Sequence, residues 1–252
     1  MDLKSEFADF LTEIRPTTNQ RDEMKSAHAT LRTRLRADEK LGPIIVGDFL
    51  QGSYRRHTAV RPKGDKRSDV DIIIVTKLSE AEYKPEPAMA LFEPFLESYY
   101  KGKWRKQGRS FGIDLSHVSL DLVITSAPSE SEIGVFKSDA VESDDDLLDA
   151  PDWRLNESWI AIDKRYRADA RELLKKAAES REWALTPLRI PDRDARKRDD
   201  THPLEHIRWT RDKNAATDRN FVNVVKAIKW SRLEMYPDTK HPKGFPLERL
   251  VG

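Results

Sequence analysis

The stretch "FLQGSYRRHTAVRPKGDKRSDVDIIIV", residues 49–75, decides the fold of this chain. It places Gly52 and Ser53 before a basic segment, and it ends with Asp69 and Asp71 at the start of an apolar run that is typical of a buried β-strand. Because side chains alternate across a strand, both aspartates are expected on the same side of it. Two carboxylates at that spacing repel each other unless a cation lies between them. We therefore interpret this strand end as a functional site.

A third carboxylate, Asp121, lies inside another strongly apolar segment, "VSLDLVIT", residues 118–125. A charge in a buried strand is costly unless it has a partner. Carboxylate oxygens are the hard ligands that Mg²⁺ prefers, with the phosphates of a substrate completing its shell. The alternative for Asp121 is a strand end or a salt bridge to an arginine. The Asp-x-Asp pattern alone is weak, because it recurs at residues 144–146 and 192–194 in turn-rich segments.

Gly52 and Ser53 supply the complementary half of a phosphate site. A small residue pair between a strand and a basic turn lets backbone N–H groups approach an anion closely, and the serine hydroxyl adds a donor. The alternative is an ordinary tight turn with a serine helix cap. The combination with the aspartates favours the phosphate site.

A helix predicted near the end of the sequence, over residues 218–237, carries two lysines. Lys226 and Lys229 lie three residues apart on one helical face, where one of them could hold the charge of a triphosphate. The alternative is a solvated lysine pair. The neighbouring face is predicted to be the buried one, through Phe221, Val224, Val225 and Ile228.

The remaining pattern predicts how the elements follow one another. Strands alternate with helical stretches over residues 43–135, which indicates an α/β or mixed α+β lobe, and helices dominate thereafter. An acidic, turn-rich segment at 138–152 follows the first lobe, and residues 190–200 are predicted to be an exposed linker. The expected strands are 43–50, 70–76 and 118–125, and the expected helices are 2–14, 19–41, 84–104, 163–184, 202–214 and 218–237.

Composition limits the class of protein. The chain has 252 residues and no cysteine, which excludes disulfides, thiolate metal sites and cysteine nucleophiles. Lys plus Arg number 45 against 44 Asp plus Glu, so no strong general binding to nucleic acid is expected. The N-terminus lacks the apolar core of a signal peptide, and no apolar run is long enough to span a membrane. We expect a cytoplasmic protein with no membrane partner.

The order Gly-Ser, Asp-x-Asp on a strand and a single Asp on a later strand resembles the polymerase-beta-like nucleotidyltransferase superfamily. Within it, the chain most resembles the cGAS/DncV-like nucleotidyltransferases (CD-NTases) of bacterial CBASS anti-phage systems, also through "QGSY", "NFVNVVKAIKW" and "HPKGFPLERLVG". The resemblance implies an α+β fold: a nucleotidyltransferase core with a mixed sheet and flanking helices over 43–135, and a helical C-terminal lobe over 136–252. N-terminal helices, residues 1–42, would pack across both lobes of a bilobed molecule with an active-site cleft. It also suggests that the C-terminal helices continue past residue 252.

The resemblance also implies a chemistry. Asp69, Asp71 and Asp121 would be catalytic and would bind two Mg²⁺ ions, for which Mn²⁺ could substitute. Nucleotide phosphates would be bound by Gln51, Gly52 and Ser53, and by Lys229 or, second, Lys226. NTPs, ATP among them, would be condensed into a cyclic di- or trinucleotide second messenger with release of pyrophosphate, and a regulatory or activating protein partner would be in keeping with the family.

Two other functions fit the same motifs. A template-independent transferase could modify an RNA end or a protein hydroxyl, although the near-neutral charge argues against an RNA acceptor. A catalytically silent nucleotide-binding module is the second, and the presence of all three aspartates argues against it. Incubation with NTPs alone separates these possibilities, because only the signalling enzyme needs no added acceptor.

Overall fold

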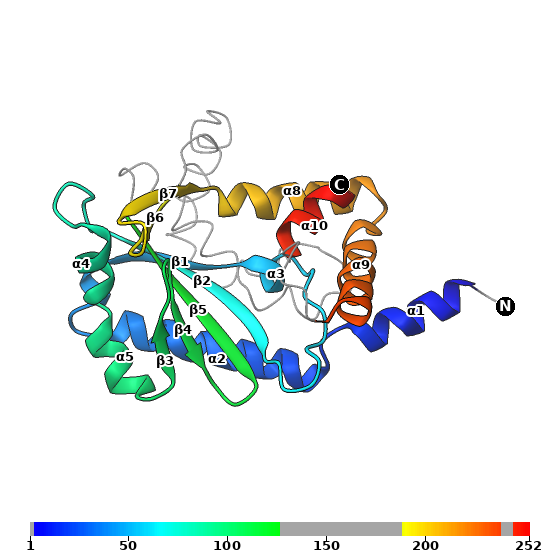
Figure 1. The fold of residues 1–252 in the computed structure, drawn as a ribbon, viewed down its shortest axis with the longest axis horizontal. Coiled ribbons are helices and arrows are strands. Elements are labelled where there is room, and N and C mark those ends of the chain that lie inside the picture. The colour runs from blue at the N-terminus through cyan, green and yellow to red at the C-terminus, as the bar shows by residue number, and fades with distance from the viewer. Residues whose placement is uncertain (1–2, 127–187, 238–243) are drawn as a thin grey trace, which may run out of the picture.

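The computed structural model of this chain describes residues 3–126, 188–237 and 244–252 (Figure 1). Its helices are α1 (Leu3–Ile14), α2 (Thr18–Ala37), the 3-10 turn η1 (Gly42–Ile44), α3 (Gly52–Arg55), α4 (Pro85–Ala90), α5 (Glu93–Tyr100), α8 (Pro203–Ala216), α9 (Phe221–Met235) and α10 (Gly244–Val251). Its strands are β1 (Ile45–Gln51), β2 (Ser68–Thr76), β3 (Trp104–Lys106), β4 (Phe111–Asp114), β5 (Val118–Ser126), β6 (Leu188–Asp192) and β7 (Lys197–Thr201).

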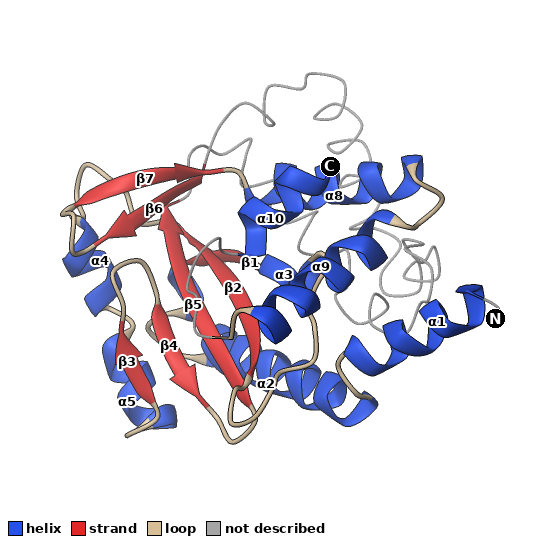
Figure 2. Ribbon diagram, turned by 45° about the vertical axis from the view of Figure 1, so that its right-hand side comes forward, coloured by secondary structure: helices blue, strands red, loops and turns tan. Residues whose placement is uncertain are grey.

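Seven strands of the described residues form one mixed sheet (Figure 2). The order is β1-β2-β5-β4-β3, and the β6–β7 hairpin continues from the end of β5. β2 and β5 pair in parallel, whereas the other pairings are antiparallel. This sheet with its flanking helices confirms the predicted α+β class. The bilobed shape, the cleft and the lobe boundaries stay predictions.

The main core lies between the sheet and the helices α2, α4 and α5. Alternate residues of the central strands, such as Ile72 and Leu122, join side chains of these helices, such as Leu31 and Leu96, in one buried cluster. The other sheet face carries a smaller cluster that includes Ile73 and Val123. β2 is therefore apolar on both faces, as expected for a covered central strand.

The C-terminal helices α8, α9 and α10 lie together at the end of the sheet where β1 runs into α3 (Figures 1 and 2). α9 packs against α10, α8 and α1, and α10 also contacts α3. The N-terminal and C-terminal helices thereby meet beside the Gly-Ser segment. Among the described residues, no helix is long and apolar enough to cross a membrane.

Most predicted elements are confirmed, with boundaries shifted by a few residues, and two predictions are wrong. The helix expected over 84–104 is broken into α4, α5 and β3, because Pro94 begins a new helix at its first turn. In this segment Leu91 and Tyr99 are exposed, while Phe92 and Leu96 are buried.

The second wrong prediction is the exposed linker at 190–200, which contributes to the β6–β7 hairpin. Arg189 at its base pairs with Asp200, and Arg198 donates to the Tyr83 carbonyl oxygen, so its charges have partners in the fold. The predicted helix 163–184 and the acidic segment 138–152 lie outside the described residues.

Candidate active site

Three carboxylates gather where the two parallel strands begin. In the β2–β5 register, Asp71 is opposite Asp121 and Asp69 is opposite Ser119. Residues opposite each other in the register share a face of the sheet, so Asp71 and Asp121 lie on one face. Asp69 lies on that face too, because every second residue of a strand points to the same side. This face is the one that also carries Ile73, and it points away from α2. We refer to Asp69, Asp71 and Asp121 as the carboxylate trio.

The pKa of every carboxyl in the trio is raised, by desolvation at all three and by repulsion within the trio at Asp69 and Asp71. Desolvation is the largest cause at all three positions. Repulsion from Asp71 and Asp121 adds to it at Asp69, and repulsion from Asp121 adds to it at Asp71. Asp69 lies at the exposed edge of the strand, so solvent screens its charge more than the half-buried charges of the other two. The trio therefore gains from any cation that neutralises it.

The trio has few protein partners. Among the described residues, a single hydrogen bond reaches its carboxylates: Gln107 Nε2 donates to Asp121 Oδ1 at 3.2 Å. Arg105 lies close enough to lower the pKa of Asp69 and Asp121, but its ion pair is with Asp114. Most oxygens of the trio are thus left for a ligand.

The donor chemistry of the trio fits a hard divalent cation, because all of its donors are carboxylate oxygens. The raised pKa values of these carboxyls are what a site lacking its counter-charge should have. No group of three or more His, Cys, Asp or Glu side chains in the described part of the chain is arranged to hold a metal ion as it stands. The residues fit the cation by type and by face, and their side chains need to reorient around it.

Gly52 is required by its contact with the trio. It has a φ of +74°, and a Cβ at this position would lie 1.7 Å from Asp71 Oδ2. Gln51, which precedes it, is opposite Asp71 in the β1–β2 register. Ser53 follows in the short helix α3, and its hydroxyl has no hydrogen-bond partner among the described residues. The predicted phosphate segment therefore borders the predicted metal ligands directly.

The α9 helix is turned differently from its apolar pattern. Phe221 and Val225 are buried as predicted, but Val224 is 39% and Ile228 is 36% exposed. The two lysines, Lys226 and Lys229, are only 9% exposed each. Burying ammonium groups while leaving aliphatic ones in solvent costs free energy. The lysines therefore face inward for a reason other than packing.

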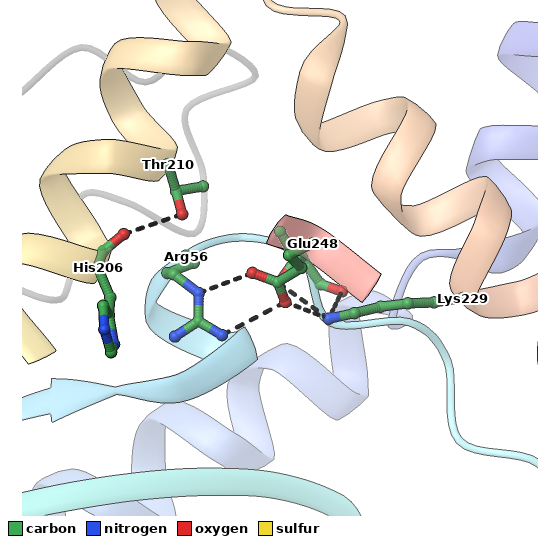
Figure 3. Close-up of polar contacts among 6 residues, drawn as sticks. Arg56, His206, Thr210, Lys229 and Glu248 are labelled. Carbon is green, nitrogen blue, oxygen red and sulfur yellow. Dashed lines mark hydrogen bonds and ion pairs between the residues drawn. The ribbon is translucent and has the colours of Figure 1, made fainter. Parts of the chain in front are cut away.

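Lys229 belongs to a buried polar cluster, the Glu248 network, formed by Glu248, Arg56 and Lys229 (Figure 3) together with Thr58. Arg56 Nε donates to Glu248 Oε2 at 2.8 Å, and Thr58 Oγ1 donates to Oε1 at 2.7 Å. Lys229 Nζ donates to the same Oε1 and, at 3.2 Å, to the Thr58 carbonyl oxygen. Each charge in this network has an opposite charge beside it.

Lys226 differs from Lys229 in having no such partner. No described residue forms a hydrogen bond or ion pair with it, and burial, followed by repulsion from Arg15, Lys229 and Arg21, lowers its pKa to about 7. His57, four residues after Ser53, is close enough that Lys226 helps to lower its pKa to about 3, after desolvation, so this imidazole stays neutral. An anion is the partner that Lys226 lacks.

The structure thus places every predicted site residue in one of two neighbouring regions. Asp69, Asp71, Asp121, Gln51 and Gly52 lie together, and the lysines face the segment that follows Ser53. Sequence reasoning missed Arg56, Glu248 and Gln107. Arg56 and Glu248 stood within quoted motifs, but nothing in their pattern indicated a contact across 192 residues.

Three comparisons bear on what this arrangement is. A family model described as "Second Messenger Oligonucleotide or Dinucleotide Synthetase domain" matches residues 1–130. The cyclic AMP-AMP-GMP synthase of Enterobacter hormaechei is 46% identical over 258 residues, which cover all of this chain and 68% of that protein.

Solved structures add the fold. Vibrio cholerae DncV cyclic AMP-GMP synthase, in complex with the linear intermediate 5′ pppA(3′,5′)pG, aligns with a TM-score of 0.65 at 12% identity over 95% of this chain and 68% of its own. The CdnC:HORMA-deltaN complex of E. coli MS115-1 aligns with a TM-score of 0.57 at 14% identity over 97% of this chain and 60% of the other. At these identities the likeness concerns the fold alone.

Proposed function

This chain belongs to the family of second messenger oligonucleotide or dinucleotide synthetases, and is thus a nucleotidyltransferase that makes cyclic oligonucleotides; from that premise we propose the substrates, the product and the residues that act. The substrates are ATP and GTP, and the product is a cyclic trinucleotide of two adenylates and one guanylate. Support comes from the relative with 46% identity, which is named for that product. The family favours this reading over a transferase that modifies an RNA end or a protein hydroxyl, and over a silent module.

The proposal rests on one observation: Asp71 lies opposite Asp121 in the β2–β5 register, and Gly52 lies directly against Asp71 Oδ2. Nucleotidyl transfer needs a place where an acceptor hydroxyl, an α-phosphorus and a leaving pyrophosphate lie in line. A carboxylate trio beside a glycine with no room for a side chain lets the phosphates approach the acidic groups closely. The proposed reacting position is therefore between the trio and Ser53.

The trio is proposed to bind Mg²⁺, or Mn²⁺ in its place. When bound, such ions neutralise the phosphate charge and acidify the attacking ribose hydroxyl. The trio would supply carboxylate oxygens as ligands, and the Ser53 hydroxyl would donate to a phosphate oxygen. Asp121 would take the proton of the attacking hydroxyl on Oδ2, since Oδ1 accepts the bond from Gln107.

Each condensation forms one bond from the ribose oxygen to the α-phosphorus and breaks the bond to pyrophosphate. The proton leaves the hydroxyl, and the pyrophosphate departs with the negative charge. Two such steps give a linear trinucleotide, and a third, within that molecule, closes the ring. Three NTPs therefore yield one cyclic product and three pyrophosphates.

Of the two lysines, Lys226 is proposed to bind the triphosphate. It is buried, cationic below its pKa of about 7 and without a protein anion, and a polyphosphate would raise that pKa by supplying the missing charge. Lys229 is already paired with Glu248, and is proposed to hold the segment around Thr58 in place. This ranking reverses the order suggested by the sequence motif.

The product is proposed to serve as a second messenger in anti-phage defence, under the control of a protein partner. The fold similarity to CdnC supports the second part, because CdnC is found there in a complex with HORMA-deltaN.

The test is a reaction of the purified protein with Mg²⁺ and ATP, GTP or both, with no other acceptor. We expect pyrophosphate release and a nuclease-resolved cyclic product containing AMP and GMP only when both NTPs are present. Asp71→Asn should abolish it, whereas Asp65→Asn, a matched change at an exposed position, should not. A product from ATP alone would contradict the proposed bases, and an unchanged yield from Asp71→Asn would sink the role of the trio.

A further inference from the structure

Asp121 is the one member of the trio that the described residues hold by a hydrogen bond, and the donor, Gln107, lies in the loop between β3 and β4. The carboxylates of Asp69 and Asp71 accept none from the described residues. Like charges on one face repel each other, so a carboxylate without a hydrogen bond can turn away from its neighbours. The Asp121 carboxylate is held by one oxygen and cannot turn freely. Its other oxygen then points in a defined direction.

The orientation of the Gln107 amide is set by a second bond. The Ser110 hydroxyl donates to Gln107 Oε1 at 2.7 Å, and the Gln107 backbone N–H donates to the Ser110 carbonyl oxygen at 3.0 Å. A carboxylate accepts only from a donor, so the NH₂ group must face Asp121 and the amide oxygen must face Ser110. The chain Ser110–Gln107–Asp121 is therefore consistent at every link.

The space for this contact depends on Gly112. Gly112 is opposite Asp121 in the β4–β5 register, and a Cβ there would lie 2.5 Å from Gln107 Nε2. A side chain at residue 112 would displace the amide. The space that Gly112 leaves beside Asp121 is thus occupied by the side chains of Gln107 and Arg105.

The loop itself is anchored by the β6–β7 hairpin. The Arg193 backbone N–H donates to the Gly108 carbonyl oxygen at 2.8 Å, and Arg109 pairs with Asp192 at 2.8 Å and with Asp199 at 2.5 Å. A Cβ at Gly108 would lie 2.5 Å from Asp194 Oδ2, so the loop and the hairpin are in close contact.

We propose that Gln107 is a positioning residue for nucleotidyl transfer, which orients the Asp121 carboxylate from a loop clamped by the β6–β7 hairpin. This inference rests on the proposed function, since it assigns Gln107 a part in that reaction. Gln107 is neutral, so it fixes the carboxylate without repelling a cation. A side chain that orients a metal ligand typically changes metal affinity or activity by about 10- to 100-fold when removed.

The experiment compares Gln107→Leu with Gln107→Glu, and with Gln20→Leu as a control at the capped start of α2. Steady-state kinetics and the binding of Mn²⁺ alone, followed by electron paramagnetic resonance without nucleotide, are both measured. We expect Gln107→Leu to lower kcat by about 10- to 100-fold with little change in KM for ATP, and to weaken Mn²⁺ binding by about 10-fold. Gln107→Glu should lower kcat further, because it adds a fourth carboxylate.

The Mn²⁺ measurement separates this inference from the proposed function. One outcome is that the wild-type protein makes no oligonucleotide, while Asp121→Asn and Gln107→Leu both bind Mn²⁺ more weakly than the wild type, and to the same extent. In that case Gln107 does position Asp121, and the proposed reaction is wrong. Wild-type kcat and wild-type Mn²⁺ affinity in Gln107→Leu would overturn the inference. Should that variant not fold, Ser110→Ala removes the orienting hydroxyl and is expected to shift both quantities in the same direction by less.

Discussion

Two charge clusters among the described residues, the Glu248 network and the carboxylate trio, differ in whether the protein neutralises them. The Glu248 network has an anion, two cations and a hydroxyl that satisfy one another, and Glu248 itself is fully buried. The carboxylate trio has three anions, one hydrogen bond from the described residues and raised pKa values. The Glu248 network is buried, whereas the trio is only partly removed from water. Only the first resembles a cluster that exists for the fold.

The difference separates structure from function without reference to any family. A closed cluster stabilises the fold as a unit and is damaged when one member is lost. An open cluster costs stability in the free protein and gains its partner from a ligand. Lys226 belongs with the open kind, although it lies one helical turn from Lys229 in the closed kind.

Glu248→Ala should be the most damaging change to the closed cluster. It leaves Arg56 and Lys229 buried without their anion, which is expected to lower the free energy of unfolding by about 3–5 kcal/mol. Asp69→Ala, in the open cluster, should leave it unchanged or raise it. Urea unfolding followed by circular dichroism compares the two, and equal losses would erase the distinction.

Gly52→Ala tests the contact between the phosphate segment and the trio. Both a left-handed φ and a clash with Asp71 Oδ2 oppose a methyl group here, so we expect about 2–4 kcal/mol of destabilisation together with loss of activity. Gly64→Ala is the matched control, since Gly64 has a φ of +57° but no atom within 4 Å of the added Cβ. It should cost about 1 kcal/mol and keep activity. Similar effects at both positions would mean that backbone strain alone explains Gly52.

Lys226→Met and Lys229→Met should act in opposite directions on stability. Removing the unpartnered buried cation is expected to raise the free energy of unfolding by about 1–2 kcal/mol, whereas removing Lys229 lowers it because Glu248 loses a partner. Lys226→Met should also raise KM for ATP by about 10-fold or more, as a lost charge-assisted phosphate contact does. A destabilised Lys226→Met protein would show that an unrecognised partner neutralises this lysine.

The smallest effect concerns pH. The pKa of Lys226 is about 7 in the folded protein against an ordinary value of 10.5, so between these two pH values the unfolded chain binds more protons. The cost of burying the charge is therefore fully present below about pH 7 and declines as pH rises, so this group makes stability increase by up to about 1 kcal/mol per pH unit. The free energy of unfolding should therefore rise less between about pH 7 and about pH 9 in Lys226→Met than in the wild type. Identical differences would contradict the lowered pKa.

Local patterns predicted the acidic region well, because its parts are close in the chain or paired in one sheet. Asp69 and Asp71 share a face because side chains alternate along a strand. The apolar segment around Asp121 predicted a second buried strand, and this strand does lie beside the first. The register that puts Asp121 opposite Asp71 is a tertiary fact, and the sequence left it open.

The basic region was harder to predict. The apolar positions of α9 favoured burying Val224 and Ile228, but the helix turns its lysines inward because Glu248 and the segment after Ser53 provide polar surroundings there. The β6–β7 hairpin was missed for a similar reason. Its strands are rich in charge, and their partners, such as Glu80 and Arg109, come from elsewhere in the chain.

The contact between Arg56 and Glu248 also sets an order of events during synthesis on the ribosome. The strands that hold the trio lie within residues 45–126, and they can pair once that part has emerged. Arg56 belongs to the same early part, yet its counter-ion is made 192 residues later. Until residue 248 leaves the ribosome, Arg56 lacks this counter-ion. The acidic half of the site can therefore form as soon as residues 45–126 have emerged, whereas the basic half is completed only after residue 248 has been added.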